Sequence, residues 1–233
     1  MNVALGQMAR RAVRAGVVNR SRPLLRLLFG LALLEAALWA PVWLGVVFGV
    51  GALGYMAWQL RRSAATLRSM GLSLSGTARA SWPAGIAVAL SLAMLGLAYY
   101  NGTLHRLWGI RQWWWAVVAY AVWALVQEFM LQAFCLRMLR AAVSRMSALL
   151  LSGAVFALAH LPNPTLTFIT FFAGVAFAAI YARSRNLFVV AAIHALLGLT
   201  LAVSAPDHWL YGLRVGRGFQ QHSASLAANM TVR

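Results

Sequence analysis

The chain has 233 residues, of which 62% are hydrophobic and only 10% charged, and its formal net charge is +17. Soluble domains are about 45–50% apolar and about 25% charged, so this composition excludes an ordinary water-soluble fold. The basic residues are all arginine and lie between apolar runs rather than on one face, which argues against a nucleic-acid partner. We therefore expect an all-α, polytopic membrane helix bundle in contact with the lipid bilayer.

An arginine-rich segment, residues 1–23, opens the chain. About seven apolar segments follow, forming one bundle over residues 24–204, and each approaches the ~20 residues that a helix needs to cross a bilayer. The expected spans are 24–40, 42–60, 81–99, 113–136, 147–161, 165–182 and 187–204. Residues 205–233 form a polar tail, which we expect to be loosely ordered at its end.

The arginines predict the orientation of these spans. The densest clusters lie in segments 1–23, 61–80, 137–146 and 183–186, which alternate with arginine-poor connections. Because cytoplasmic loops carry an excess of basic residues, these four segments are predicted to be cytoplasmic. The N-terminus would then be inside the cell and the tail outside it.

Three ionisable residues stand out inside the apolar spans. Glu128 lies in the fourth predicted span, His160 at the end of the fifth and His194 in the seventh. At 1.5 Å per helical residue, each lies about 14–20 Å from the predicted cytoplasmic side, which puts all three near the middle of the bilayer. Since an ionisable residue at this depth is costly, the three together predict a functional site.

A structural explanation remains open for each residue taken alone. Glu128 and Gln132 are four residues apart and could simply hydrogen-bond on one helix face. A histidine in a membrane helix often joins neighbouring helices. Glu35, near the outer end of the first span, has no matching partner in the sequence and is better explained as structural. After His160, Asn163 lies between two prolines, and irregular backbone at this depth indicates a buried or wet cavity.

The spacing of these residues resembles that of the CPBP family of intramembrane endopeptidases, which includes CAAX prenyl-protein endopeptidases and bacteriocin-processing members. Phe156 to His160 matches the family's Phe-x-x-x-His motif, and His194 matches the histidine of a later His-x-x-x-Asn motif. The resemblance covers roughly residues 113–200, within a core at 113–204.

Three positions depart from the family pattern. Gln127 and Gln132 replace the first Glu and the Arg of a Glu-Glu-x-x-x-Arg motif, and Gly198 replaces the Asn of the last motif. The loss of this Asn removes an expected oxyanion donor. The Gln-Glu and His-Ala-Leu-Leu-Gly variants are similar to a myxosortase-like bacterial subgroup, which implies a bacterial inner-membrane protein.

The resemblance implies an intramembrane endopeptidase that needs no cofactor and cleaves a membrane-anchored protein or peptide. Glu128 would activate a water molecule, while His160 and His194 would orient it and stabilise the oxyanion. Residues that would position substrate or water are Gln127, Gln132, Phe156, Asn163 and Gly198.

Two other functions remain open. Because Gln127 cannot accept a proton as a glutamate does, the chain could be a catalytically impaired relative that binds a substrate tail or a partner in the same cavity. Alternatively, Glu128, His160 and His194 are a legitimate ligand set for zinc. A zinc site of this kind leaves no obvious base, so it is the least favoured of the three hypotheses.

Overall fold

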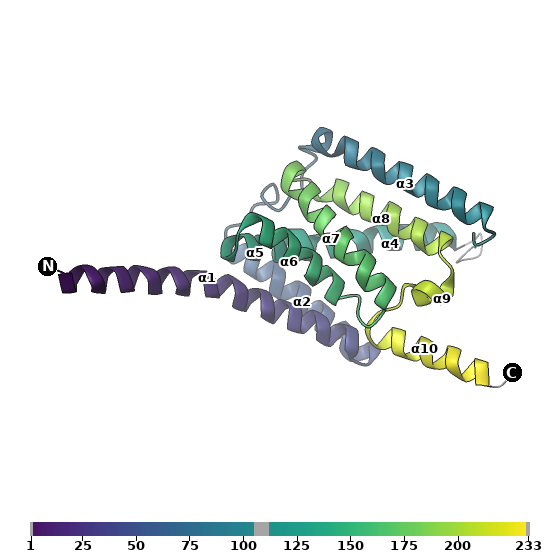
Figure 1. Ribbon diagram of the computed structural model, residues 1–233, viewed down its shortest axis with the longest axis horizontal. Helices are drawn as coiled ribbons and strands as arrows, with labels where there is room; N and C mark the ends of the chain where they lie inside the picture. Colours follow the sequence, from purple (N-terminus) through teal and green to yellow (C-terminus); the bar gives the residue numbers. More distant parts are fainter. Residues whose placement is uncertain (1, 105–111, 232–233) are drawn as a thin grey trace.

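The computed structural model describes residues 2–104 and 112–231, and within these ranges the chain forms helices and no strand (Figure 1). The long helices before the midpoint are α1 (Asn2–Trp39), α2 (Val42–Arg62) and α3 (Ser81–Tyr100). The second half contains α4 (Trp113–Glu128), α5 (Arg137–Ala142), α6 (Arg145–Leu158), α7 (Pro164–Ser184), α8 (Leu187–Ser204), α9 (Asp207–Leu210) and α10 (Gly216–Thr231). Shorter pieces are η1 (Thr77–Ala80), the π-helix η2 (Phe129–Leu136) and η3 (Tyr211–Leu213).

The predicted membrane helix bundle is confirmed. Among the described residues, five helical stretches are long and apolar enough to cross a membrane: 42–62, 77–100, 113–142, 164–184 and 187–204. Helix α6 is apolar but has only 14 residues. Helix α1 runs without interruption from the arginine-rich segment through Pro23 into the first predicted span. The chain is therefore a multi-pass membrane protein, while the count of seven spans stays a prediction.

The helices pack both with neighbours along the chain and with helices distant in the sequence. Helix α1 packs against α2 and α6 against α7, whereas α8 lies against both α3 and α4 (Figure 1). The α6–α7 contact is close because Gly153 and Gly174 face each other: a Cβ on Gly174 would lie 3.0 Å from Cα of Gly153 and 2.9 Å from Cβ of Phe156. Small residues of this kind let membrane helices approach closely. This close approach fixes Phe156 against α7.

Two of the four segments predicted to be cytoplasmic, 61–80 and 183–186, meet at one end of the bundle. The Arg185 side chain donates to the backbone carbonyl of Ser69 at 2.9 Å, and the Leu187 amide donates to the Gly71 carbonyl at 2.8 Å. These bonds join the connection after α2 to the connection between α7 and α8. Their position agrees with an alternating path of the chain, and which side of the membrane this end faces stays a prediction.

The segments predicted to lie outside meet at the opposite end. The Thr103 hydroxyl donates to the Ser204 carbonyl at 3.1 Å, and the Gly216 amide donates to the Leu161 carbonyl at 2.7 Å. The polar tail, expected to be loosely ordered at its end, is helical over Gly216–Thr231. A hydropathy pattern could not predict this helix, because the chain at its start is held by hydrogen bonds to the turn after α6.

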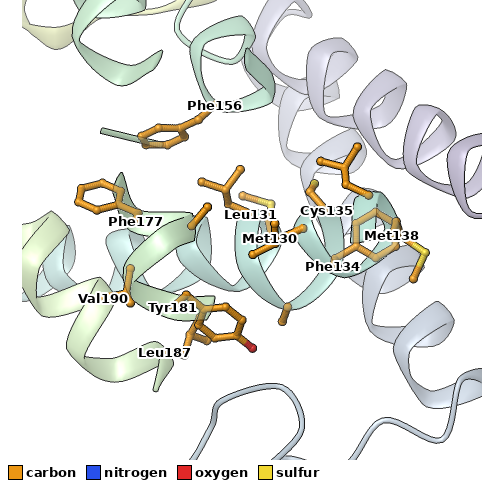
Figure 2. Packing of buried hydrophobic residues seen from close by; sticks show 14 of the residues in the cluster. Met130, Leu131, Phe134, Cys135, Met138, Phe156, Phe177, Tyr181, Leu187 and Val190 are labelled. Carbon is orange, nitrogen blue, oxygen red and sulfur yellow. The ribbon is translucent and has the colours of Figure 1, made fainter. Parts of the chain in front are cut away.

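The core is centred on η2, whose side chains from Met130 to Leu136 are all buried. Figure 2 shows Phe134 and Met138 on one side of this cluster and Phe156 and Phe177 on the other. The π-helix thus lies between the α1–α2 pair and the α6–α7 pair. It follows directly after Glu128, the predicted acid, which is the last residue of α4.

Candidate functional site

The site is built around a buried carboxylate–imidazole pair. Oε1 of Glu128, at the end of α4, lies 2.9 Å from Nδ1 of His194 on α8. Glu128 is fully buried and His194 is 7% exposed. A carboxylate accepts hydrogen bonds, so Nδ1 of His194 is the donor in this pair, and Nε2 has no hydrogen-bond partner within the described part of the chain. The predicted meeting of these two residues at one depth is therefore a direct contact in the structure.

The second carboxylate oxygen of Glu128 is also engaged. The Gln132 amide donates to Oε2 at 2.9 Å, which is the four-residue pair that the sequence left open as a structural explanation. The π-helix η2 starts at the residue after Glu128. Such insertions are frequent at functional sites, and here one follows the acid directly. Gln132 therefore orients the carboxylate and lies behind it.

His160 is held by the end of its own helix. Its Nδ1 lies 2.7 Å from the backbone carbonyl oxygen of Phe156, one turn earlier. The last carbonyls of a helix have no partner within the helix, so the imidazole satisfies one of them. Since a carbonyl only accepts, Nδ1 is the protonated nitrogen of the neutral ring and Nε2 has a free lone pair. This contact accounts for the four-residue spacing, and the ring contact of Phe156 with His160 accounts for the aromatic residue.

The two imidazoles share one aromatic environment. The ring of Phe156 lies 4.7 Å from that of His160 and 5.5 Å from that of His194, both edge-on. Phe177 of α7 stacks on His194 with ring centroids 5.2 Å apart. These contacts position both imidazoles without using their Nε2 atoms.

A cavity of about 320 Å³ adjoins both imidazoles. Most of its wall is apolar and comes from α1, α3, α4, η2, α6, α7 and α8, with Leu213 and Val215 at one end. Its polar wall includes Tyr120, Gln127, His160 and His194. Gln127 makes no hydrogen bond within the described part of the chain, so its amide is available to a bound molecule. Glu128 is not among the described residues that line the cavity.

In the structure the predicted site residues form two groups, and Asn163 lies apart from both. Those that face the cavity are Gln127, Phe156, His160, His194 and Gly198. Glu128 and Gln132 form the layer behind His194. The expectation that Glu128 itself contacts the attacking water stays a prediction, but this geometry does not favour it, because both of its oxygens are engaged by protein groups.

Asn163 has a structural position away from the cavity wall. Its side-chain oxygen accepts from the Leu166 amide at 3.1 Å and caps α7. Its side-chain nitrogen donates to the carbonyls of Leu210 at 2.7 Å and Arg214 at 3.2 Å. Because Leu213 and Val215 lie on the cavity wall, Asn163 anchors the segment that closes this end of the cavity. The predicted role of Asn163 in positioning substrate or water is not supported by these contacts.

Replacing Asn163 by Ala is expected to lower the free energy of unfolding by about 2–4 kcal/mol, since one helix cap and two donated bonds are lost. Asn163→Ser keeps an acceptor for the cap but does not reach the two carbonyls, so its loss should be smaller. Thermal unfolding in detergent measures both effects, and limited proteolysis reports release of residues 205–216. Unchanged protease resistance in Asn163→Ser would contradict the anchoring role.

Glu35 lies outside this site. Its carboxylate accepts from the Trp39 indole at 3.2 Å, one turn along the same helix. The structural interpretation of Glu35 is therefore favoured, with a tryptophan as its partner. This carboxylate provides a natural control for changes at Glu128.

The zinc hypothesis needs Glu128, His160 and His194 to point at one metal ion. In the structure the carboxylate bonds to His194 itself, and no cluster of three metal-ligating side chains occurs among the described residues. The arrangement of these three side chains therefore does not fit a zinc site. Metal analysis of the purified protein remains its direct test.

Two residues of the site were not predicted from the sequence. Phe177 stacks on His194, and Tyr120 places its hydroxyl group beside Gly198. An isolated aromatic residue in an apolar helix gives no signal of either contact. The one indication in the sequence was Gly198, which stands where the family has Asn, one turn after His194. A glycine there leaves space that another side chain can fill.

Part of the chain matches a known protein family. Residues 108–200 match the model of the Rce1-like family, described as type II CAAX prenyl endopeptidase Rce1-like. The match covers less than half of the chain but contains Gln127, Glu128, Phe156, His160 and His194, the residues on which the resemblance rested. The comparisons with curated proteins and with solved structures found nothing that matches. The match supports intramembrane endopeptidase function in general.

Proposed function

We propose, from the premise that this chain is a CPBP-family intramembrane protease with its Rce1-like region at residues 108–200, that it hydrolyses a peptide bond of a membrane-associated protein. The observation that carries the mechanism is the bond between Glu128 and Nδ1 of His194. It gives a buried acid, an oriented imidazole and an adjoining cavity. The roles of the residues in the reaction follow from this arrangement.

The first step is attack of water on the scissile carbonyl. Nε2 of His194 accepts a proton from the water, and the water oxygen bonds to the carbonyl carbon. Glu128 holds His194 in the required tautomer and stabilises the imidazolium that forms. His160 offers a second Nε2 acceptor, which orients the same water. The Glu128 carboxylate thus acts through His194 and need not touch the water.

The second step is collapse of the tetrahedral intermediate. The carbon–nitrogen bond breaks as the proton on Nε2 of His194 passes to the leaving amine. The products are a new carboxylic acid and a new amine, between which the second proton of the water equilibrates, and His194 returns to its starting state. Gln127, whose amide faces the cavity, positions the scissile peptide.

The substrate class follows from the surroundings of the site. A cavity with a mainly apolar wall inside a membrane bundle favours a peptide presented by a membrane anchor. Prenylated CAAX peptides are one candidate, since the matched family is named for them. The arginine distribution further favours an N-terminus in the cytoplasm, and the resemblance to a myxosortase-like subgroup favours a bacterial inner membrane.

The test uses the purified full chain in lipid vesicles with two probes, a farnesylated CAAX peptide and a peptide carrying one apolar transmembrane segment. In water enriched in ¹⁸O, mass spectrometry should find the label in the new carboxylate of one probe. His160→Ala should lower kcat about 10²-fold, because the water loses one of its two acceptors. Absence of cleavage of both probes by the wild type would overturn the proposal.

A second function is favoured by one observation: Gln127, not an acid, is the residue of this pair on the cavity wall. The chain could then bind a substrate tail or partner without cleaving it. Gln127→Glu separates the two functions in the same assay. Cleavage by this variant and none by the wild type would favour the binding function.

A further inference from the structure

Tyr120 of α4 fills a space that α8 leaves open. Gly198 lies one turn after His194 on α8, and a Cβ built on Gly198 would overlap the hydroxyl oxygen of Tyr120 and lie 2.8 Å from its Cζ. A longer side chain at position 198 would therefore occupy the space that the Tyr120 hydroxyl now occupies. The glycine and the tyrosine are a matched pair from two helices.

The hydroxyl of Tyr120 is positioned beside the reactive groups. Tyr120 lines the same cavity as His160 and His194, and its ring lies edge-on to the His194 ring with centroids 6.3 Å apart. Within the described part of the chain no hydrogen bond to this hydroxyl occurs, and it is not among the side-chain atoms sealed from solvent without a partner. An available O–H group therefore faces the cavity.

The reaction requires such a donor. The Nδ1–H groups of both imidazoles are already committed, His160 to a carbonyl and His194 to a carboxylate. Their Nε2 atoms are acceptors when the water is bound, so neither ring can donate to the oxygen that becomes negative as attack begins. The Thr170 hydroxyl, also on the wall, donates to its own helix at 2.8 Å. The Gln127 amide is uncommitted but is assigned above to positioning the scissile peptide. The Tyr120 hydroxyl is the uncommitted donor nearest to Gly198, one turn after His194.

We propose that Tyr120 is a catalytic residue that donates a hydrogen bond from its hydroxyl to the carbonyl oxygen of the scissile peptide as that oxygen becomes an oxyanion. This role rests on the proposed endopeptidase function. The hydroxyl keeps its proton throughout, so the transfers through His194 are unchanged. The bond strengthens as charge develops on the oxygen, which lowers the barrier more than it improves binding of the substrate.

The test compares Tyr120→Phe with the wild type, using whichever of the farnesylated CAAX peptide and the single-span peptide the wild type cleaves. Loss of one oxyanion donor should lower kcat about 10²–10³-fold and leave KM within about threefold. Tyr181→Phe is the matched control, since it removes the same atom from a buried tyrosine of α7 outside the cavity. Its kcat should stay within about twofold of the wild type.

Rescue distinguishes a chemical role from a packing role. In the double variant Tyr120→Ala with Gly198→Asn, the amide enters the space left by the ring and restores a donor from α8. Its kcat should exceed that of Tyr120→Ala at least tenfold. Equal kcat in Tyr120→Phe and the wild type would overturn the role of Tyr120 while cleavage by the wild type upholds the endopeptidase. A wild type that cleaves neither probe overturns both proposals.

Discussion

Glu128→Gln is expected to lower kcat about 10⁴-fold and to leave KM nearly unchanged, the loss typical when the carboxylate that orients a catalytic imidazole is neutralised. The amide has nearly the same shape, but it carries no charge to stabilise the His194 imidazolium. It also offers N–H groups as well as an oxygen, so it no longer requires a proton on Nδ1. Kinetics in the reconstituted vesicle assay measure this effect.

The matched control is Glu35→Gln, which makes the same chemical change at a carboxylate that bonds to Trp39. It should cleave within about twofold of the wild-type rate. Nitrogen-15 spectra of the His194 ring supply a second measurement, because Glu128→Gln should change the population of the tautomer with a proton on Nδ1. An unaltered tautomer with full activity would contradict the role given to Glu128.

Much of the fold could be predicted because the bilayer restricts the possible structures. Backbone groups in hydrocarbon must bond within their own segment, so apolar runs of sufficient length become helices. The depth of Glu128 and His194 could be estimated from helical rise alone, and the two residues do meet. What the estimate lacked was rotation about the helix axis, which decides whether Gln127 or its neighbour faces the cavity.

The remaining features depend on contacts between distant segments. A π-helix follows Glu128, and nothing in its apolar sequence indicates it. The fit of Tyr120 against Gly198 requires knowing that α4 and α8 are neighbours. Asn163 was predicted as a site residue from its place between two prolines. In the structure its side chain caps α7 and donates hydrogen bonds to two backbone carbonyls. Local patterns identified the polar residues but could not assign their partners.

His194→Ala is expected to lower kcat at least 10⁴-fold, because the imidazole is both the proton acceptor in the first step and the donor in the second. KM should change little if the side chain takes no part in holding the substrate. His208→Ala is the control, since it removes an exposed imidazole from α9. The vesicle assay with the cleaved probe measures both variants, and cleavage by His194→Ala at more than one-tenth of the wild-type rate would contradict the mechanism.

The double variant Glu128→Gln with His194→Ala tests how the two residues are coupled. If Glu128 acts through His194, removing it from a protein that already lacks the imidazole should cause no further loss, and the double variant should match His194→Ala alone. If Glu128 instead activated water independently, the two losses would multiply. The 2.9 Å bond between the residues and the absence of Glu128 from the described cavity wall both favour the first outcome. A multiplicative loss would return the role of base to Glu128 and leave His194 to orient the water.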